Sequence, residues 1–171
     1  KSVMSQRDVP GVTIAAIPLL KKHGVVAFSE GCNGQIEAPQ VPIIYNWTFQ
    51  SDSIIMMLHP RGYGDTAPRG FNTHSDVYDD DYLGLGSTDI CPDASDVVTV
   101  DGFDEALVYA FKPDNQGPHY PYEAATTFSC VKKLFPDAEI IGSTFDDFIS
   151  ALVIHGTEAL PIIRDLEMGD T

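Results

Sequence analysis

Basic residues are scarce in this sequence. Its 171 residues include 10 Lys and Arg against 25 Asp and Glu, which gives a formal net charge of −15 at pH 7. A chain of this charge repels phosphate groups, and no local cluster of Lys and Arg offsets the repulsion. We therefore expect neither a nucleic acid nor an anionic membrane surface as a partner. A neutral ligand such as a sugar is permitted.

Long apolar runs and closely spaced cysteines are also missing. No run approaches the roughly 18 apolar residues that a membrane-spanning helix requires. Cys32, Cys91 and Cys130 are far apart and do not have the spacing of Cys-x-x-Cys or Cys-His zinc sites, so we expect free thiols. Nothing in the sequence indicates a cellular compartment.

The two ends of the chain indicate a piece of a longer protein. The first residue is Lys1 rather than Met, and the last residues show neither a capping helix nor a polar tail. The length of 171 residues suits one domain or part of one. We therefore expect the remainder of its own chain as a partner.

Helical and strand-like segments alternate along the sequence, which predicts an α/β fold with a mostly parallel sheet, either a barrel or a doubly wound sheet. In such folds the functional residues gather beyond the carboxyl ends of the strands. The stretch 60–96 is rich in Gly, Asp and Tyr and is expected to be a binding or active-site loop. We expect helices over 13–23, 121–134 and 145–154, and strands over 25–28, 43–49, 54–58, 107–111, 138–142 and 160–163.

Three local signals refine these boundaries. Pro18 fits only the first turn of a helix, so the helix expected over 13–23 should begin later than its apolar pattern does. Thr144 followed by Asp147 resembles a capping box at the start of the 145–154 helix. The stretch 50–53 has turn composition, which makes the two flanking strands neighbours or a hairpin.

Three further segments, taken in chain order, carry a resemblance to a known family. Residues 8–13 read Asp-Val-Pro-Gly-Val-Thr and precede a helix. Residues 57–65 read Met-Leu-His-Pro-Arg-Gly-Tyr-Gly-Asp, and residues 113–118 read Pro-Asp-Asn-Gln-Gly-Pro. In this order they resemble segments of glycoside hydrolase family 38, the α-mannosidase family. The stretches 135–148 and 166–170 are also similar to later parts of that family's barrel.

The resemblance implies a role for each matching residue. Asp8 corresponds to the Asp of the family's Asp-Pro-Phe-Gly-His-Ser, which is both the nucleophile and a zinc ligand, although Val12 stands in place of the family's His. Asp65 corresponds to the acid/base residue. The residues expected to contact the sugar are His59, Tyr63, Asp114 and Asn115.

The resemblance also implies a fold, a metal and an activity. The chain would be part of an incomplete (β/α) seven-stranded barrel that spans residues 1–171, with the first strand and the C-terminal domains absent. The activity would be retaining hydrolysis of α-mannosides or related sugars. Such chemistry needs two carboxyl groups about 5 Å apart, which Asp8 and Asp65 would supply. Zinc would be the cofactor, and its remaining ligands lie outside this chain, so we expect the piece alone to be inactive.

Each candidate residue also has a purely structural interpretation. Asp8 stands shortly before Pro10-Gly11 and Asp65 directly follows Gly64, in surroundings where Asp commonly forms turns and helix caps. Asp114-Asn115 is a turn pair by composition, and a lone His59 after an apolar strand is commonly a hydrogen-bonded structural residue.

Two other functions remain open at this stage. One is a family-38-like domain that has lost catalysis and binds carbohydrate or supports its neighbours. The other is a polysaccharide deacetylase, which needs a His-rich metal motif that this sequence does not contain.

Overall fold

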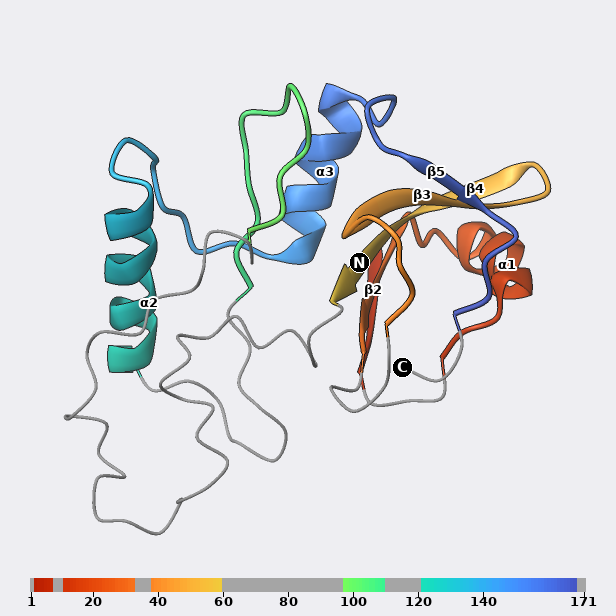
Figure 1. Ribbon diagram of the computed structural model, residues 1–171, viewed down its shortest axis with the longest axis horizontal. Helices are drawn as coiled ribbons and strands as arrows, with labels where there is room; N and C mark the ends of the chain where they lie inside the picture. The colour runs from red at the N-terminus through yellow and green to blue at the C-terminus, as the bar shows by residue number, and fades with distance from the viewer. Residues whose placement is uncertain (1, 8–10, 33–37, 60–96, 110–120, 169–171) are drawn as a thin grey trace, which may run out of the picture. The chain divides into compact units, whose positions relative to one another are not determined.

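A five-stranded mixed sheet organises the described part of the chain, which in this computed structural model comprises residues 2–7, 11–32, 38–59, 97–109 and 121–168 (Figure 1). The strand order is β1-β2-β4-β3-β5. β1, β2 and β4 are parallel, while β3 is antiparallel to β4 and parallel to β5. The α/β class predicted from the sequence is confirmed. The strands are β1 (Val3–Arg7), β2 (Ala27–Gly31), β3 (Ile44–Phe49), β4 (Asp52–His59) and β5 (Ile162–Arg164).

The residues form two compact units. The first unit comprises Lys1–Gly64, Val98–Leu107 and Ser143–Thr171, and it holds the sheet, the 3-10 helix η1 (Ile14–Ala16) and the helices α1 (Ile17–Lys22) and α3 (Phe145–His155). The second unit comprises Asp65–Val97 and Val108–Gly142, and it holds α2 (Pro121–Leu134).

The helix predicted over 13–23 is split in the structure, as Pro18 suggests. Thr13 caps η1 by accepting a hydrogen bond from the Ala15 backbone N–H at 3.4 Å. α1 then begins at Ile17, which places Pro18 in its first turn, where the missing N–H costs no hydrogen bond. Lys21 and Lys22 lie in the last turn, where positive charge suits the helix dipole.

α3 begins where the sequence predicts and is tied to β1. The Thr144 side chain accepts a hydrogen bond from the Asp147 N–H at 3.2 Å, which confirms the predicted N-cap. Asp146 in the first turn accepts hydrogen bonds from the backbone N–H groups of Ser2 and Val3 and from the Ser2 hydroxyl. The Ser2 backbone hydrogen bond is the main reason that the Asp146 pKa is lowered. Asp146 therefore fixes the start of the first strand.

The two faces of the sheet have different neighbours, and Figure 1 shows α1 and α3 on opposite sides of it. Side chains alternate between the faces along each strand. One face forms the hydrophobic core with η1 and α1, and the other bears Ser29 and Met57 and faces α3. Segment 98–107 packs on α3 through Phe103, whose ring centroid lies 5.9 Å from that of Phe148. The buried core residues are Ile14, Ile17, Phe28, Cys32, Tyr45, Trp47, Ile54, Met56, Leu58 and Met168.

The strands predicted over 25–28, 43–49, 54–58 and 160–163 overlap β2, β3, β4 and β5, whereas two other predicted strands are not in the sheet. β3 and β4 form the expected antiparallel pair around Gln50, which has a φ of 53°. The strand predicted over 138–142 is wrong, since this stretch is not in the sheet and Ile141 is 69% exposed. The strand predicted over 107–111 is reduced, within the described residues, to a single bridge between Val98 and Leu107.

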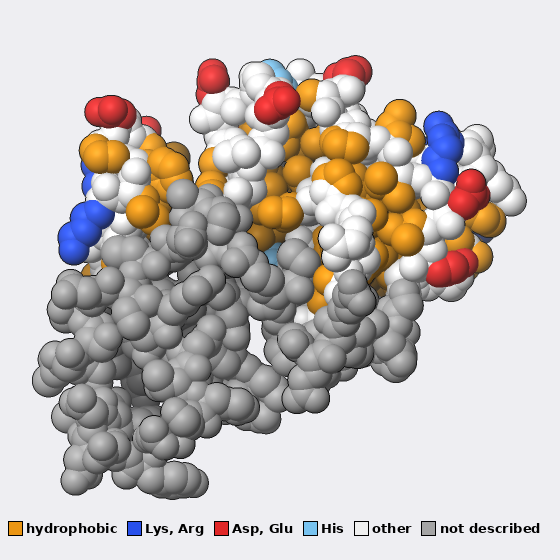
Figure 2. All heavy atoms as spheres, viewed as in Figure 1, with side chains coloured by type: hydrophobic (Ala, Val, Ile, Leu, Met, Phe, Trp, Pro, Cys, Tyr) orange, Lys and Arg blue, Asp and Glu red, His pale blue; other side chains and the backbone are white. Residues whose placement is uncertain are grey.

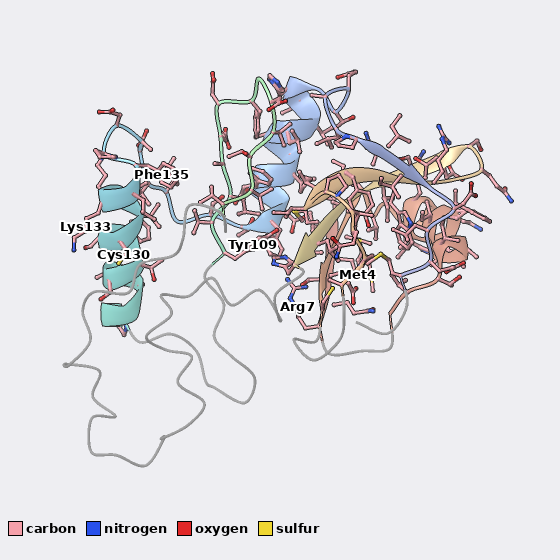
Figure 3. The ribbon with its side chains drawn as sticks, viewed as in Figure 1. Met4, Arg7, Tyr109, Cys130, Lys133 and Phe135 are labelled. Carbon is pink, nitrogen blue, oxygen red and sulfur yellow. The ribbon has the colours of Figure 1, made fainter. Side chains whose placement is uncertain are left out.

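The cysteines differ from one another. Cys32 is free and buried, as predicted. Cys130 in α2, labelled in Figure 3, is disulfide-bonded, so the prediction of a free thiol there is wrong. Sequence spacing carried no signal for this bond because a disulfide depends on proximity in the fold.

The surface agrees with the low content of basic residues. On the face shown in Figure 2, Lys and Arg side chains appear in small separate groups rather than as one patch. Lys21 pairs with Asp52 at 3.2 Å. Among the described residues, no helix has both the length and the apolar character needed to cross a membrane.

Candidate functional site

Three parallel strands end side by side and create a polar edge in the first unit. In the sheet register Arg7 of β1 lies opposite Gly31 of β2, and Gly31 lies opposite His59 of β4. All three residues are the last of their strands. The carboxyl ends of parallel strands are where α/β folds place their ligand-contacting residues. We call Arg7, Ser29 and His59 the edge cluster.

Arg7, labelled in Figure 3, contacts residues of the neighbouring strands at this edge. Its Nη1 donates to the carbonyl oxygen of Gln6 at 2.6 Å and to that of Ser29 at 2.8 Å. Its Nη2 donates to the Ser29 hydroxyl at 3.0 Å and to His59 Nε2 at 3.3 Å. A planar guanidinium carries enough donors in fixed directions to make such contacts at once. One side chain therefore bridges β1, β2 and β4.

His59 is held neutral at this edge. The residue is 5% exposed, and its Nε2 lies 3.1 Å from the Ser29 hydroxyl. Burial, and secondarily the positive charge of Arg7, lower the His59 pKa from 6.5 to about 3. The imidazole is consequently uncharged at neutral pH and offers hydrogen bonding rather than charge.

This lowered pKa predicts an acid-sensitive contribution to stability. As the pH falls, the unfolded chain protonates His59 near pH 6.5, whereas the folded chain does so only near pH 3. Between these two pKa values the free energy of unfolding therefore falls by up to about 1.4 kcal/mol for each unit by which the pH falls. Between about pH 6.5 and 5, we expect the free energy of unfolding of the wild type to fall by about 2 kcal/mol relative to His59→Gln.

Urea denaturation at the two pH values checks this difference, since the contributions of the many carboxylates largely cancel between the two proteins. His155→Gln, at an exposed histidine of α3, is the matched control for the loss of an imidazole. Parallel pH dependence of the wild type and His59→Gln would show that His59 is not held neutral.

Ser29 and His59 have the separation of a nucleophile and its base, but their surroundings favour a structural hydrogen bond. Ser29 is fully buried, and its oxygen also accepts a hydrogen bond from Arg7. A nucleophile needs access to the reacting carbon of a substrate. The pair therefore carries no acyl-transfer proposal.

The opposite face of β2 buries a second group of polar side chains. Glu30 is fully buried there, as is Cys32. Burial raises the Cys32 pKa, with a smaller contribution from the Glu30 charge, and the Tyr45 pKa is raised for the same main reason. The thiol and the phenol therefore stay protonated, which makes them poor nucleophiles or metal ligands.

The connection that follows β1 is anchored on both sides of residues 8–10. Before it, the Gln6 side-chain amide donates to the Gly11 carbonyl oxygen at 3.1 Å. After it, the Val12 N–H donates to the Met168 carbonyl oxygen at 3.0 Å, and the Ile14 N–H donates to Glu167 at 2.8 Å. The C-terminal segment thus holds the start of η1 in place.

Of the site residues predicted from the sequence, the structure describes His59 alone. Asp8, Tyr63, Asp65, Asp114 and Asn115 lie outside the described residues. His59 is described, and it stands at the carboxyl end of a strand, as expected.

Arg7 and Ser29 were not singled out by sequence reasoning. Arg7 has one available signal, because it directly precedes the motif Asp8 in a chain with few cations. Ser29 has none, since a serine within an apolar run is common.

The described residues alone do not form a zinc site. Among them, no group of three or more His, Cys, Asp and Glu side chains is arranged to hold a metal ion. The Nε2 of His59 faces the cationic guanidinium of Arg7, which opposes a second cation at that nitrogen. The groups of the edge cluster instead hydrogen-bond to one another and hold the ends of the three strands together.

Comparisons with family models, with curated proteins and with solved structures found no match to this chain.

Proposed function

We propose that this chain is part of a retaining glycoside hydrolase that acts on α-mannosides or related sugars, with Asp8 as the nucleophile. The observation that carries the proposal is the register of the edge cluster. Arg7 ends β1 beside Gly31 and His59, at the carboxyl edge of three parallel strands. Asp8 is the next residue in the sequence, and it stands in the motif that resembles the nucleophile segment of family 38.

The proposed fold is a finer version of the observed one. The parallel strands β1 and β2 are joined through α1, which is the repeating unit of a (β/α) barrel. We infer that the mixed sheet belongs to an incomplete seven-stranded barrel, to which the remainder of the protein would add strands.

The proposed reaction uses two carboxyl groups in two steps. The Asp8 carboxylate attacks the anomeric carbon while Asp65 donates a proton to the departing glycosidic oxygen, which gives a glycosyl-enzyme ester and a free alcohol. Asp65 then accepts a proton from water, the water oxygen attacks the anomeric carbon, and the ester bond to Asp8 breaks. Two inversions leave the anomeric configuration unchanged.

Binding would rely on hydrogen bonds and stacking. His59 is uncharged, Tyr63 would stack on a sugar face, and Asp114 and Asn115 would accept or donate hydrogen bonds to hydroxyl groups. An uncharged sugar also avoids the repulsion that the net charge of −15 exerts on anions. Zinc, when bound, would take Asp8 as one of its oxygen ligands and would assist charge development at the sugar.

Proton NMR of an aryl α-mannoside incubated with the complete protein tests the proposal. The expected first product is the α-anomer of the free sugar, which appears before mutarotation. A first product of β configuration would contradict the retaining mechanism. Release of acetate from an acetylated glycan would instead identify a deacetylase, and sugar binding without turnover would identify a binding domain.

A further inference from the structure

Arg7 is the donor in the hydrogen bonds that it makes with Ser29 and His59. Arginine only donates, so the His59 Nε2 that faces Arg7 Nη2 at 3.3 Å must present its lone pair. The Ser29 oxygen accepts from Arg7 at 3.0 Å and lies 3.1 Å from the same His59 nitrogen. In a neutral imidazole the proton then lies on Nδ1, an assignment that follows from the network.

The same arginine limits the movement of the strand that leads to Asp8. Its contacts with the Ser29 carbonyl and hydroxyl tie the last residue of β1 to the middle of β2. Its contact with His59 ties that residue to the end of β4. The bonded residues are 22 and 52 positions from Arg7 in the sequence, so they restrain the chain end across the sheet rather than locally.

We propose that Arg7 is a positioning residue for the glycosidase site, which fixes His59 in one neutral tautomer and holds the end of β1 from which Asp8 follows. The inference rests on the proposed function for its catalytic part. Its structural part, the tautomer of His59, is measurable without any substrate. Arg7 itself neither gives nor takes a proton in the reaction.

Kinetics and nitrogen NMR of the complete protein test this role together. In Arg7→Met we expect kcat for an aryl α-mannoside to fall by about 100-fold with KM changed less than about 3-fold, because a displaced nucleophile lowers the rate more than it weakens binding. The 15N shifts of the His59 ring should show an unprotonated Nε2 in the wild type and both tautomers in Arg7→Met.

Two further variants sharpen the comparison. Arg7→Lys keeps the positive charge but lacks the planar guanidinium with its several donors. It should therefore recover only part of kcat, and its His59 ring should also populate both tautomers. Arg164→Met removes an exposed arginine of β5 and should match the wild type in both measurements. If Arg7→Met does not fold, Arg7→Lys provides the same two measurements.

The outcomes separate this inference from the proposed function. An unchanged His59 tautomer in folded Arg7 variants would overturn the positioning role, whatever the activity. A wild type that is inactive on α-mannosides would overturn the proposed function, while the NMR result would still decide whether Arg7 fixes His59.

Discussion

Replacing Asp8 by Asn is expected to lower kcat for aryl α-mannoside hydrolysis by roughly 10,000-fold, as the loss of a group that acts directly in covalent catalysis commonly does. The amide has nearly the shape of the carboxylate but is a far weaker nucleophile, so the glycosyl-enzyme does not form. The fold should be unaffected by so small a change. Initial rates with the complete protein, together with far-UV circular dichroism, provide the measurement.

Two controls make the Asp8 result specific. Asp101→Asn changes an exposed aspartate of the same unit and should retain wild-type activity. Thermal unfolding of both variants shows whether stability has changed. Wild-type activity in Asp8→Asn would mean that Asp8 is an ordinary turn residue, and the glycosidase assignment would lose its nucleophile.

Replacing Trp47 by Ala is expected to lower the free energy of unfolding by about 3–5 kcal/mol. The indole is fully buried in the core between the sheet and η1, and its Nε1 donates to the Leu166 carbonyl oxygen at 2.9 Å. The substitution removes this packing and leaves a carbonyl without its donor. It should also loosen the C-terminal segment whose next residue, Glu167, accepts a hydrogen bond from the Ile14 N–H at the start of η1.

Urea denaturation followed by circular dichroism measures this loss, since Trp47 is the only tryptophan and its fluorescence disappears with it. Trp47→Phe keeps most of the packing and loses the hydrogen bond, so it should cost about 1–2 kcal/mol. Leu19→Ala, at a residue that is 62% exposed, should change stability little. If Trp47→Ala lowers the free energy of unfolding by less than about 1 kcal/mol, the C-terminal segment does not depend on the core around Trp47.

The sequence predicted elements best where local patterns decide the structure. α2 spans Pro121–Leu134, as the helical period and the opening proline predicted. The Thr144 cap and the late start of α1 at Ile17 also follow from backbone chemistry within a few residues. Such signals need no knowledge of the rest of the fold.

Strands were harder to predict because a strand exists only with a partner. β1 reads Val-Met-Ser-Gln-Arg, with little apolar character, and it lies at the sheet edge where side chains are only partly buried. It was therefore missed. The apolar stretch at 138–142 looks like a strand in sequence but has no place in the sheet.

The candidate site was only partly predictable for a similar reason. His59 was found because it follows an apolar strand, and Asp8 because it stands in a motif. Arg7 and Ser29 became visible only through the register of β1 on β2, which brings together residues 22 positions apart. No periodicity in the sequence reports such a pairing.

The most direct test of the glycosidase assignment is mass spectrometry of the complete protein after incubation with a fluorinated mannosyl donor that forms a long-lived glycosyl-enzyme. If the account is correct, the proteolytic peptide that contains Asp8 gains the mass of one fluorosugar, and fragmentation places the label on Asp8. A label on another residue, or an unlabelled Asp8 peptide from protein that turns over α-mannosides, would contradict it.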